Sequence, residues 1–513
     1  MDLSKIKKVY MIGVKGVGMT MLGQFLSSKG VEVSGSDTAE VFMTDQVLAK
    51  FGIKVNQGFN AANVPNDVDL IIYSSAYNPT TNVEVAKALS SKVKTLTYAE
   101  VLGEVFNRMY GIAVCGSHGK TTTTAWLGYV MWKSGLEPNV LVGARVEQFD
   151  GAGVFGNSDY MVIEADEYQN KLKHYNPKGV LLNNIDHDHH DFYPTLESYI
   201  QAFTDFMAKL PKGGFLAANF DDEHIAKTAN VNCRGKVLSY ALEREDVNYF
   251  AYDIRQQGLK QYFKVRYADS SDLSLVEDAV KIPGEDFAAR VSPTLSAKGG
   301  NLLASAATRP SKAQVGGLAG GEDLGDFSIS LLGRHNIYNA LAVIATCVEL
   351  GVELRDIRTH LEGFTGADRR MRVMGKFKGA TIIDDYGHHP TEIKTTLAGL
   401  RAAYPRERIT AVFHPHTFTR TKALLDDFAA SFGDADKVIV LKIYGSAREQ
   451  QGGVSSQDLI GKMKIIEPDK EFVYVEDLKD CEAYLRANVR RDEIVILIGA
   501  GDIFRVGEAL VNN

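Results

Sequence analysis

The sequence predicts an α/β protein of three domains that are built around parallel β-sheets. The chain has 513 residues, and at roughly 100–200 residues per domain this length corresponds to about three domains with cores of their own. Short β-branched runs alternate with amphipathic stretches along most of the chain. Two glycine-rich turns, Gly13–Gly18 and Gly116–Gly119, each follow a predicted strand and precede a predicted helix.

Ten apolar runs bounded by Gly, Asp or Asn predict buried parallel strands. In chain order they lie at residues 8–13, 31–35, 69–75, 111–116, 160–166, 179–186, 380–387, 409–414, 437–442 and 493–499. Helical patterns at 19–30 and 121–135 lie between some of these strands, and a further helix holds residues 335–351.

The two glycine turns are about 100 residues apart, too far for one βαβ unit. We therefore expect separate domains at residues 1–108, 109–368 and 369–513. Within the middle domain, residues 289–326 are rich in Ser, Ala and Gly and show no sustained period, which predicts a flexible inserted loop.

The composition excludes several classes of protein. Lys and Arg total 57 against 64 Asp and Glu, a formal charge of −7, which argues against coating of nucleic acid or binding to a membrane surface. Four scattered cysteines without a CxxC pair exclude a disulfide scaffold and a cysteine zinc site. The polar N-terminus and the lack of an apolar run near ~20 residues predict a soluble cytoplasmic protein.

The strongest local signal is the segment GIAVCGSHGKTTTT, residues 111–124. A strand that runs into a glycine turn and then a helix presents backbone N–H groups as a cradle for nucleotide phosphates. Lys120 would reach the phosphates, and the Thr121 hydroxyl would bind Mg²⁺. The spacing G-x-x-G-K-T is shorter than the usual phosphate loop, and the alternative is a plain turn with a surface lysine; its place between strand and helix favours the phosphate loop.

Acidic and histidine residues follow the next two strands. Glu164, Asp166 and Glu167 end one strand, where parallel sheets bind ligands, and residues 183–191 end another. A solvated acidic loop and a histidine zinc site are the alternatives. Hard oxygen ligands beside a phosphate loop favour Mg²⁺ over zinc, although imidazole is an unusual Mg²⁺ ligand.

The first glycine turn is a weaker signal. Its order is G-x-x-G-x-G because Lys15 occupies the place of a Rossmann glycine. Asp37 follows the second strand, roughly where a Rossmann acid would contact a ribose. A second phosphate-bearing ligand and a merely tight turn explain these residues equally well.

Three polar motifs in the last third of the chain suggest a cleft between lobes. Residues 333–340 place two amides, Asn336 and Asn339, on one helix face, which also suits capping. Residues 384–390 and 414–421 end two strands with clustered titratable groups that packing alone explains poorly.

Taken in order, these motifs resemble those of the Mur ligases, ATP-dependent enzymes that form amide bonds in peptidoglycan synthesis. The matching segments are GSHGKTTT (116–123), EADE (164–167), NNIDHDH (183–189), GRHNIYNA (333–340), DDYGHHPTE (384–392), HPHTFTRT (414–421) and GAGDI (499–503). The resemblance covers nearly the whole chain. It implies a Rossmann-like N-terminal domain for a UDP-sugar, a central ATPase domain with a phosphate loop, and a Rossmann-like C-terminal domain.

The resemblance also implies roles for individual residues. The implied catalytic residues are Lys120, Glu164, His189, Arg370 and, as base for the incoming amine, His388. The implied nucleotide contacts are Gly116, Ser117, His118, Gly119, Lys120, Thr121, Thr122, His335, Asn336, Asn339, Arg370 and Asp385. The implied contacts to the UDP-sugar acid are Gly16, Gly18, Ser36, Asp37, Ser74, Ser75, His416 and Arg420. The cofactors would be ATP and Mg²⁺, with Thr121, Glu164 and His189 as the metal ligands.

Within the family, the motifs are most similar to those of members that join L-alanine to UDP-N-acetylmuramate. The lactyl carboxylate would first be phosphorylated by ATP, and the amine would then displace phosphate from the acyl phosphate. Two departures matter: Thr417 stands where some members have arginine, and EADEY (164–168) resembles the members that attach a recycled murein tripeptide. That ligase is the main alternative.

A non-catalytic nucleotide-binding module and a dehydrogenase are further alternatives. The complete set of polar positions needed for transfer weighs against a non-catalytic module. The phosphate loop at residues 116–121 weighs against a dehydrogenase. We expect no nucleic-acid or membrane partner, and a monomer or weak homodimer.

Overall fold

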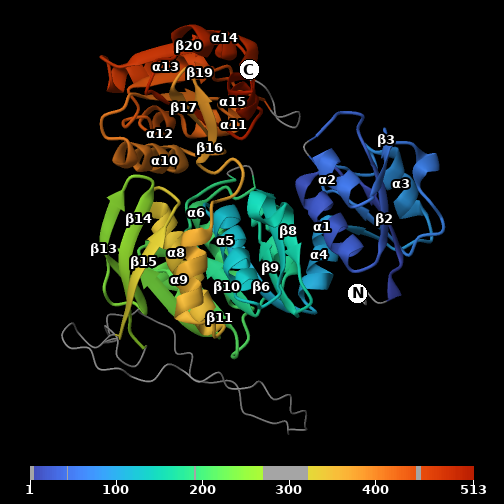
Figure 1. Cartoon of the computed structure of the whole chain (residues 1–513). Helices are drawn as coiled ribbons and strands as arrows, with labels where there is room; N and C mark the ends of the chain where they lie inside the picture. Colours follow the sequence, from blue (N-terminus) through green and yellow to red (C-terminus); the bar gives the residue numbers. More distant parts are fainter. Residues whose placement is uncertain (1–4, 43, 190–191, 270–321, 446–451, 513) are drawn as a thin grey trace.

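The computed structural model describes residues 5–42, 44–189, 192–269, 322–445 and 452–512. These segments form three β-sheets of five, ten and six strands, each flanked by helices (Figure 1). In the part of the chain that is described, no helix has the length and apolar character needed to cross a bilayer.

The first sheet is parallel throughout and has the strand order β3-β2-β1-β4-β5. Its strands are β1 (Lys8–Ile12), β2 (Glu32–Asp37), β3 (Lys54–Gln57), β4 (Leu70–Tyr73) and β5 (Thr95–Thr97), and its helices are α1 (Val17–Ser28), α2 (Thr44–Lys50), α3 (Val83–Ser90) and α4 (Tyr98–Phe106). Ile12 pairs with Ser36 and with Tyr73, so the ends of β1, β2 and β4 meet at one edge of the sheet.

The second sheet has the strand order β15-β14-β13-β12-β11-β10-β6-β9-β7-β8. Its strands are β6 (Tyr110–Cys115), β7 (Asn139–Val146), β8 (Gly151–Phe155), β9 (Tyr160–Glu164), β10 (Gly179–Leu182), β11 (Phe215–Asn219), β12 (Lys236–Ala241), β13 (Tyr249–Gln257), β14 (Lys260–Tyr267) and β15 (Glu322–Ile329). The strands from β13 to β7 pair in parallel, whereas β14, β15 and β8 pair antiparallel with their neighbours.

Both faces of the second sheet are buried, because successive side chains of a strand point to opposite faces. On β6, Ile112 and Val114 belong to one core with α5 (Lys120–Lys133), α8 (Arg334–Glu349) and α9 (Leu354–Gly363). Ala113 and Cys115 belong to the opposite core with α6 (Leu196–Met207), α7 (Glu223–Asn232), α1 and α4. The first sheet therefore shares a hydrophobic core with the second, and α1 packs against β7 and β8.

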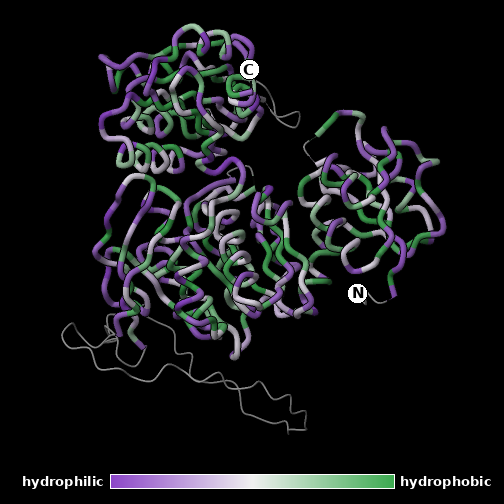
Figure 2. The backbone as a smooth tube through the Cα atoms, viewed as in Figure 1, coloured by the Kyte–Doolittle hydropathy of each residue, from purple (hydrophilic) through white to green (hydrophobic). Residues whose placement is uncertain are grey.

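The third sheet has the order β16-β17-β21-β18-β19-β20, with only β16 antiparallel to its neighbour. Its strands are β16 (Arg372–Phe377), β17 (Ala380–Asp385), β18 (Ile409–Phe413), β19 (Lys437–Leu441), β20 (Glu471–Val475) and β21 (Ile494–Ile498). Its helices are α10 (Pro390–Ala403), α11 (Phe418–Ala423), α12 (Leu425–Ala429), α13 (Ser456–Ile466), α14 (Leu478–Asn488) and α15 (Phe504–Val511), and apolar clusters cover both faces. Figure 2 shows the apolar segments concentrated inside each of the three bodies.

The third sheet lies over the second, and helix α10 contacts α8 and β13 (Figure 1). Asp385 and Phe413 both pair with Ile498, so three motif-bearing loops meet at one edge of the third sheet. That edge carries the motifs at 384–392, 414–421 and 499–503, and the first of them reaches the glycine turn at 116–119, where His118 lies 3.3 Å from Glu392.

All ten strands expected from the sequence are present and pair in parallel with one another. The prediction of a flexible loop over 289–326 is wrong for residues 322–326. They belong to β15, whose backbone pairs with β14 and whose Leu324 and Phe327 are buried. Residues 289–321 of that prediction lie outside the described part of the chain.

Candidate active site

The nucleotide turn links β6 to helix α5. Gly116 and Gly119 have φ values of +122° and +79°, a backbone region that side chains with a Cβ rarely adopt. A Cβ on Gly119 would also lie 2.7 Å from Oδ1 of Asn339. Because α5 starts directly after this turn, its free N–H groups and helix dipole favour an anion here.

Lys120, the first residue of α5, folds back over the turn. Its Nζ donates to the carbonyl of Gly116 at 2.6 Å and to Oε2 of Glu167 at 3.0 Å. Glu167 is fully buried and also accepts from the hydroxyl of Tyr199 at 2.9 Å. Burial opposes both charges, but the pair outweighs it: the pKa of Lys120 is raised by the surrounding carboxylates, and the pKa of Glu167 falls to about 2 beside Lys120 and His189.

A group of hard ligands adjoins this pair. The Thr121 hydroxyl donates to Oε1 of Glu164 at 2.9 Å, and Oε2 of Glu164 accepts the backbone N–H of Gly143 at 2.9 Å. One ligand atom each from Asp166, Glu167 and His189 lie within 4.8 Å of one another. Three carboxylates and a hydroxyl suit a divalent cation such as Mg²⁺.

The predicted metal ligands are therefore only partly brought together. Glu164 contacts Thr121, whereas Nε2 of His189 lies 3.5 Å from Oε1 of Glu167. Glu167 contacts both His189 and Lys120, the residue before Thr121 in the chain. The sequence placed Glu167 in the acidic cluster without a separate role. Its burial and its ion pair with Lys120 depend on the register of β9 against β6, which no local motif reveals.

A cavity of about 400 Å³ opens beside the turn, between the second and third sheets. Eight of the predicted nucleotide contacts line it: His118, Gly119, Thr122, His335, Asn336, Asn339, Arg370 and Asp385. Gly116, Ser117, Lys120 and Thr121 belong to the same turn and helix but are not among its lining residues. The cavity also takes in residues that the sequence did not single out, among them Asn219, Leu331 and Thr395.

The amides at the start of α8 form one wall of this cavity. Asn336 Nδ2 donates to the carbonyl of Leu332 at 2.7 Å, and Asn339 Nδ2 donates to Oδ1 of Asn336 at 3.0 Å. Burial lowers the pKa of the neighbouring His335 to about 4, which leaves its ring neutral at pH 7. This wall offers uncharged hydrogen-bonding groups, as a nucleobase requires.

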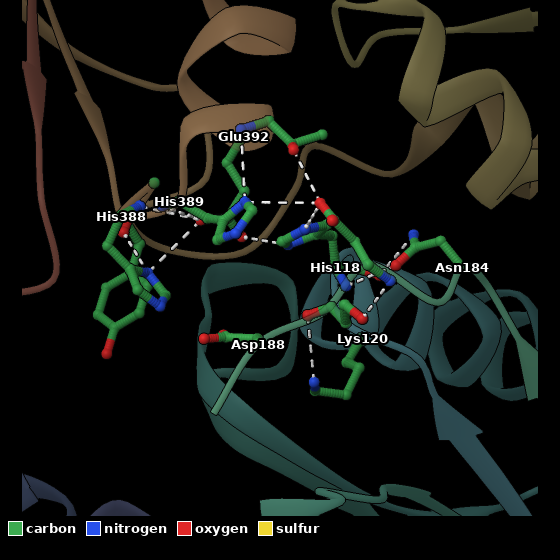
Figure 3. A network of polar contacts seen from close by, with 12 residues as sticks. His118, Lys120, Asn184, Asp188, His388, His389 and Glu392 are labelled. Carbon is green, nitrogen blue, oxygen red and sulfur yellow. Dashed lines mark hydrogen bonds and ion pairs between the residues drawn. The ribbon is translucent and has the colours of Figure 1, made fainter. Parts of the chain in front are cut away.

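The opposite wall joins the nucleotide turn to helix α10 through charged groups (Figure 3). His118 Nε2 lies 2.9 Å from Oδ2 of Asp186, and its Nδ1 lies 3.3 Å from Oε1 of Glu392. Burial alone would lower the pKa of His118, but the two carboxylates raise it to about 9. Sequence reasoning missed Asp186 and Glu392, although both stand inside motifs that it singled out.

Arg370 and Asp385 approach the cavity from the third sheet. Arg370 lies 3.8 Å from Glu392 and over the ring of Tyr386. Asp385 accepts the backbone N–H groups of Gly387 and Met371 at 2.8 and 2.9 Å. Burial raises the pKa of Asp385 to about 6, against the opposing effect of Arg370.

His388, the predicted base, lies on the same loop as Asp385. Its backbone N–H donates to Oε2 of Glu392 at 2.9 Å, and its Nδ1 lies 3.2 Å from the carbonyl of Tyr386. Burial lowers its pKa to about 4, so the ring is neutral at pH 7.

The predicted contacts of the first sheet lie apart from this cavity. Gly16, Gly18, Ser36, Asp37, Ser74 and Ser75 follow or end β1, β2 and β4, and none of them lines it. Asp37 accepts the backbone N–H of Lys15 at 2.7 Å, and the Ser36 hydroxyl bonds to the buried Glu84. The contact of Asp37 fixes the turn between β1 and α1, and the N-terminus of α1 lies at the edge of the first sheet where β1 ends.

Arg420 and His416 occupy the loop after β18. Arg420 reaches residues 183–189 after β10, here called the ligand loop, where its Nη2 lies 3.4 Å from Oδ1 of Asp188. His416 instead stacks on Tyr444, with ring centroids 5.7 Å apart. Arg420 thus contacts Asp188, the residue before His189 in the chain.

Three family models match the chain in succession. They are described as the Mur ligase family catalytic domain, matching residues 8–110, the Mur ligase middle domain, matching 114–291, and the Mur ligase glutamate ligase domain, matching 369–501.

Curated relatives match along the whole chain. A UDP-N-acetylmuramate–L-alanine ligase of Desulfitobacterium hafniense is 32% identical over 98% of this chain and 99% of its own. Proteins of the same name from Treponema pallidum and Caldanaerobacter subterraneus are 34% and 33% identical, covering 100% and 99% of this chain and 97% and 98% of their own.

Solved structures show the same fold. A UDP-N-acetylmuramate–alanine ligase of Thermotoga maritima superposes with a TM-score of 0.74 at 23% identity, covering 98% of both chains. A murein peptide ligase of Psychrobacter arcticus superposes with a TM-score of 0.67 at 21% identity, also over 98% of both chains. The matched models and the relatives over the full length together establish that this chain belongs to the Mur ligase family of ATP-dependent ligases.

Proposed function

We propose that this Mur ligase joins L-alanine to the lactyl carboxylate of UDP-N-acetylmuramate, with ATP converted to ADP and phosphate, in the synthesis of peptidoglycan precursors. One observation carries the choice of substrates: full-length relatives at 32–34% identity share the name UDP-N-acetylmuramate–L-alanine ligase. We further propose that the enzyme acts in the cytoplasm as a monomer or weak homodimer, without nucleic-acid or membrane partners.

The reaction has two balanced steps. A lactyl carboxylate oxygen attacks the γ-phosphorus of ATP, the bond to the bridging oxygen breaks, and ADP leaves. The amine of L-alanine then attacks the acyl carbon, phosphate departs with the former carboxylate oxygen, and the amine loses a proton. Phosphorylation is needed because an oxide ion is a very poor leaving group, and the protein contributes mainly positioning and charge neutralisation.

The nucleotide turn is the proposed site of the triphosphate. Residues 116–122 would bind the phosphates through backbone N–H groups, and Lys120 would exchange part of its contact with Glu167 for the β- and γ-phosphates. His335, Asn336 and Asn339 would contact the adenine side, since they form the uncharged wall of the cavity. Arg370 and Asp385 would approach the nucleotide from the third sheet.

Thr121, Glu164 and His189 are the proposed ligands of Mg²⁺, and the geometry adds Glu167 to them. When bound there, the ion would neutralise phosphate charge between ATP and the incoming carboxylate. The buried Glu167 keeps its negative charge before any ligand arrives, because Lys120 and His189 lower its pKa.

The first sheet is the proposed site of the UDP group. Gly16 is the residue before helix α1, and the free N–H groups and the dipole at the start of this helix suit a diphosphate. Gly18, Ser36, Asp37, Ser74 and Ser75 would complete that site at the same edge, and His416 and Arg420 would meet the muramyl end from the third sheet. Since these groups lie outside the nucleotide cavity, catalysis requires the lobes to close around the substrates.

We take residues 1–108, 109–368 and 369–513 as the three domains, because each of these segments contains one complete sheet. His388 is the proposed base for the incoming amine. Its ring is neutral, and its Nδ1 faces the carbonyl of Tyr386, which leaves Nε2 as the proton acceptor.

A ligase for a recycled murein tripeptide remains the second candidate. The specific feature that favours it is Tyr168, the last residue of EADEY, whose ring lies 4.6 Å from that of His189. The fold does not discriminate, since both kinds of solved ligase superpose on this chain.

Isotope transfer tests the proposed chemistry. UDP-N-acetylmuramate that carries ¹⁸O in the lactyl carboxylate should deliver one ¹⁸O to the released phosphate, detected by ³¹P NMR. Phosphate without ¹⁸O would contradict the acyl-phosphate route.

A further inference from the structure

A second cluster of metal-type ligands lies between the nucleotide turn and helix α10. It consists of His118, Asp186 and His389, and it shares no residue with the cluster around Glu167. One ligand atom from each of the three lies within 4.8 Å of the other two. The cluster therefore takes ligands from two sheets that are far apart in the sequence.

The distances in this cluster are close to those of a bound ion. His118 Nε2 and His389 Nδ1 lie 2.9 and 3.5 Å from Oδ2 of Asp186. Two ligands held at about 2.0–2.1 Å by a tetrahedral ion lie roughly 3.3–3.4 Å from each other. An ion would thus need small side-chain shifts, and it would displace the proton that His118 holds between its two carboxylates.

One of the two histidines, His118, has the kind of partner that orients histidines in metal sites. His118 turns its other nitrogen, Nδ1, to Oε1 of Glu392 at 3.3 Å, and Figure 3 shows the two side chains facing each other. Ligating histidines usually bond a carboxylate through the nitrogen that does not bind metal. Thr391 donates to Asp186 at 2.7 Å and fixes the third ligand.

The chemistry of the donors selects the kind of ion. Two imidazoles and one carboxylate suit a borderline ion such as Zn²⁺, whereas the oxygen-rich cluster around Glu167 suits Mg²⁺. His118 and Asp186 line the cavity, so an ion can reach them from solvent, while His389 is buried behind them.

We propose that His118, Asp186 and His389 form a binding site for Zn²⁺ or a similar ion that ties the nucleotide turn to helix α10. An ion there would hold the second and third sheets in the arrangement seen in this structure. The proposal does not depend on the substrates of the ligase, because the ion contacts protein side chains alone.

Cobalt binding to the full-length protein tests the site directly. Co²⁺ is added without nucleotide in excess Mg²⁺, and tetrahedral coordination is followed by visible absorption. We expect one equivalent of Co²⁺ to bind and to be displaced by Zn²⁺. His389→Gln should weaken binding at least 10-fold, whereas the matched variant His189→Gln, in the other cluster, should leave it unchanged.

Two further variants keep the test decisive if His389→Gln fails to fold. Asp186→Asn should weaken Co²⁺ binding as strongly, and Glu392→Gln about 10-fold, with the absorption spectrum retained. The proposal is overturned if the unaltered protein shows no tetrahedral Co²⁺ absorption, or if His189→Gln alone abolishes it.

Discussion

The ammonium nitrogen of Lys120 lies 3.0 Å from Oε2 of Glu167, and this ion pair joins the nucleotide turn to the loop after β9. Both side chains are largely withdrawn from water, so each charge depends on the other. The pair keeps a cation and an anion in place before nucleotide and metal arrive. In the proposed mechanism, Lys120 gives up part of this contact with Glu167 and binds the phosphates of ATP instead.

Lys120→Ala should lower the rate of phosphate release by at least about 10²-fold, because one electrostatic contact to the transferring phosphoryl group is lost. Glu167 keeps Tyr199 and His189 as partners, so the fold should persist. Phosphate release is measured by a coupled assay, with circular dichroism as the check on folding. Lys120→Arg is the matched variant that retains charge. Normal phosphate release by Lys120→Ala would contradict the assignment of the turn.

Glu167→Gln and Glu164→Gln separate the two carboxylates of the metal cluster. Glu167 contacts both Lys120 and His189, whereas Glu164 bonds to Thr121 and a backbone N–H. We expect both variants to require more Mg²⁺ for half-maximal rate, by about 10-fold or more, with the larger effect for Glu167→Gln. Titrations of rate against Mg²⁺ measure this. An unchanged Mg²⁺ requirement in both would remove the proposed metal site.

Asp384 should make the unfolding free energy fall as pH rises between about 4 and 7. Burial raises its pKa in the folded state to about 7, against the opposing effect of Arg369, while the unfolded value is about 3.9. In this window the folded state holds a proton on Asp384 that the unfolded state has already lost. Rising pH therefore favours the unfolded state, and the free energy of unfolding falls.

Asp384→Asn should remove this contribution, while Asp385, with a pKa of about 6, continues to contribute in both proteins. Urea unfolding from pH 4.5 to 8 gives the difference between variant and parent. The variant should gain stability over the parent as pH rises; a constant difference would show that Asp384 ionises normally.

Arg420→Ala should raise KM for UDP-N-acetylmuramate by about 10-fold or more and change KM for ATP much less. The reason is its position beside Asp188, at the junction of the third sheet and the ligand loop rather than in the nucleotide cavity. Steady-state kinetics with each substrate varied in turn provide the measurement. Arg408→Ala, which breaks an ion pair with Glu471 elsewhere in the third sheet, is the control. Equal effects of the two variants would count against the role of Arg420.

The sequence predicted ten parallel strands, but it missed others in the second sheet: the parallel β7, β11 and β12, and β13, β14, β15 and β8 toward its two edges. Central strands such as Ile494–Ile498 are apolar throughout, which makes them visible. Strands β13 and β14, which lie next to the edge strand β15, mix exposed and buried residues and include charged side chains, so they lack the continuous apolar run of a central strand. Residues 322–326 have a loop-like composition, and only pairing with β14 makes them a strand.

The candidate site was predictable where one motif supplies the whole geometry, as in the glycine turn before Lys120. It was not predictable where residues meet across sheets. Glu392 stands at the third position of helix α10, where it caps the helix through its Oε2, and its contact with His118 exists only because the third sheet lies over the second. Tyr199 gave no signal either, since its bond to Glu167 depends on how α6 packs.

The preference among amino substrates tests the proposed L-alanine ligase activity most directly. Phosphate release is measured with UDP-N-acetylmuramate, ATP and Mg²⁺, adding L-alanine, glycine, L-serine or L-Ala-γ-D-Glu-meso-diaminopimelate one at a time. We predict the highest kcat/KM for L-alanine, at least about 10-fold above the tripeptide. A preference for the tripeptide, or phosphate release that requires no amine, would contradict the proposed function.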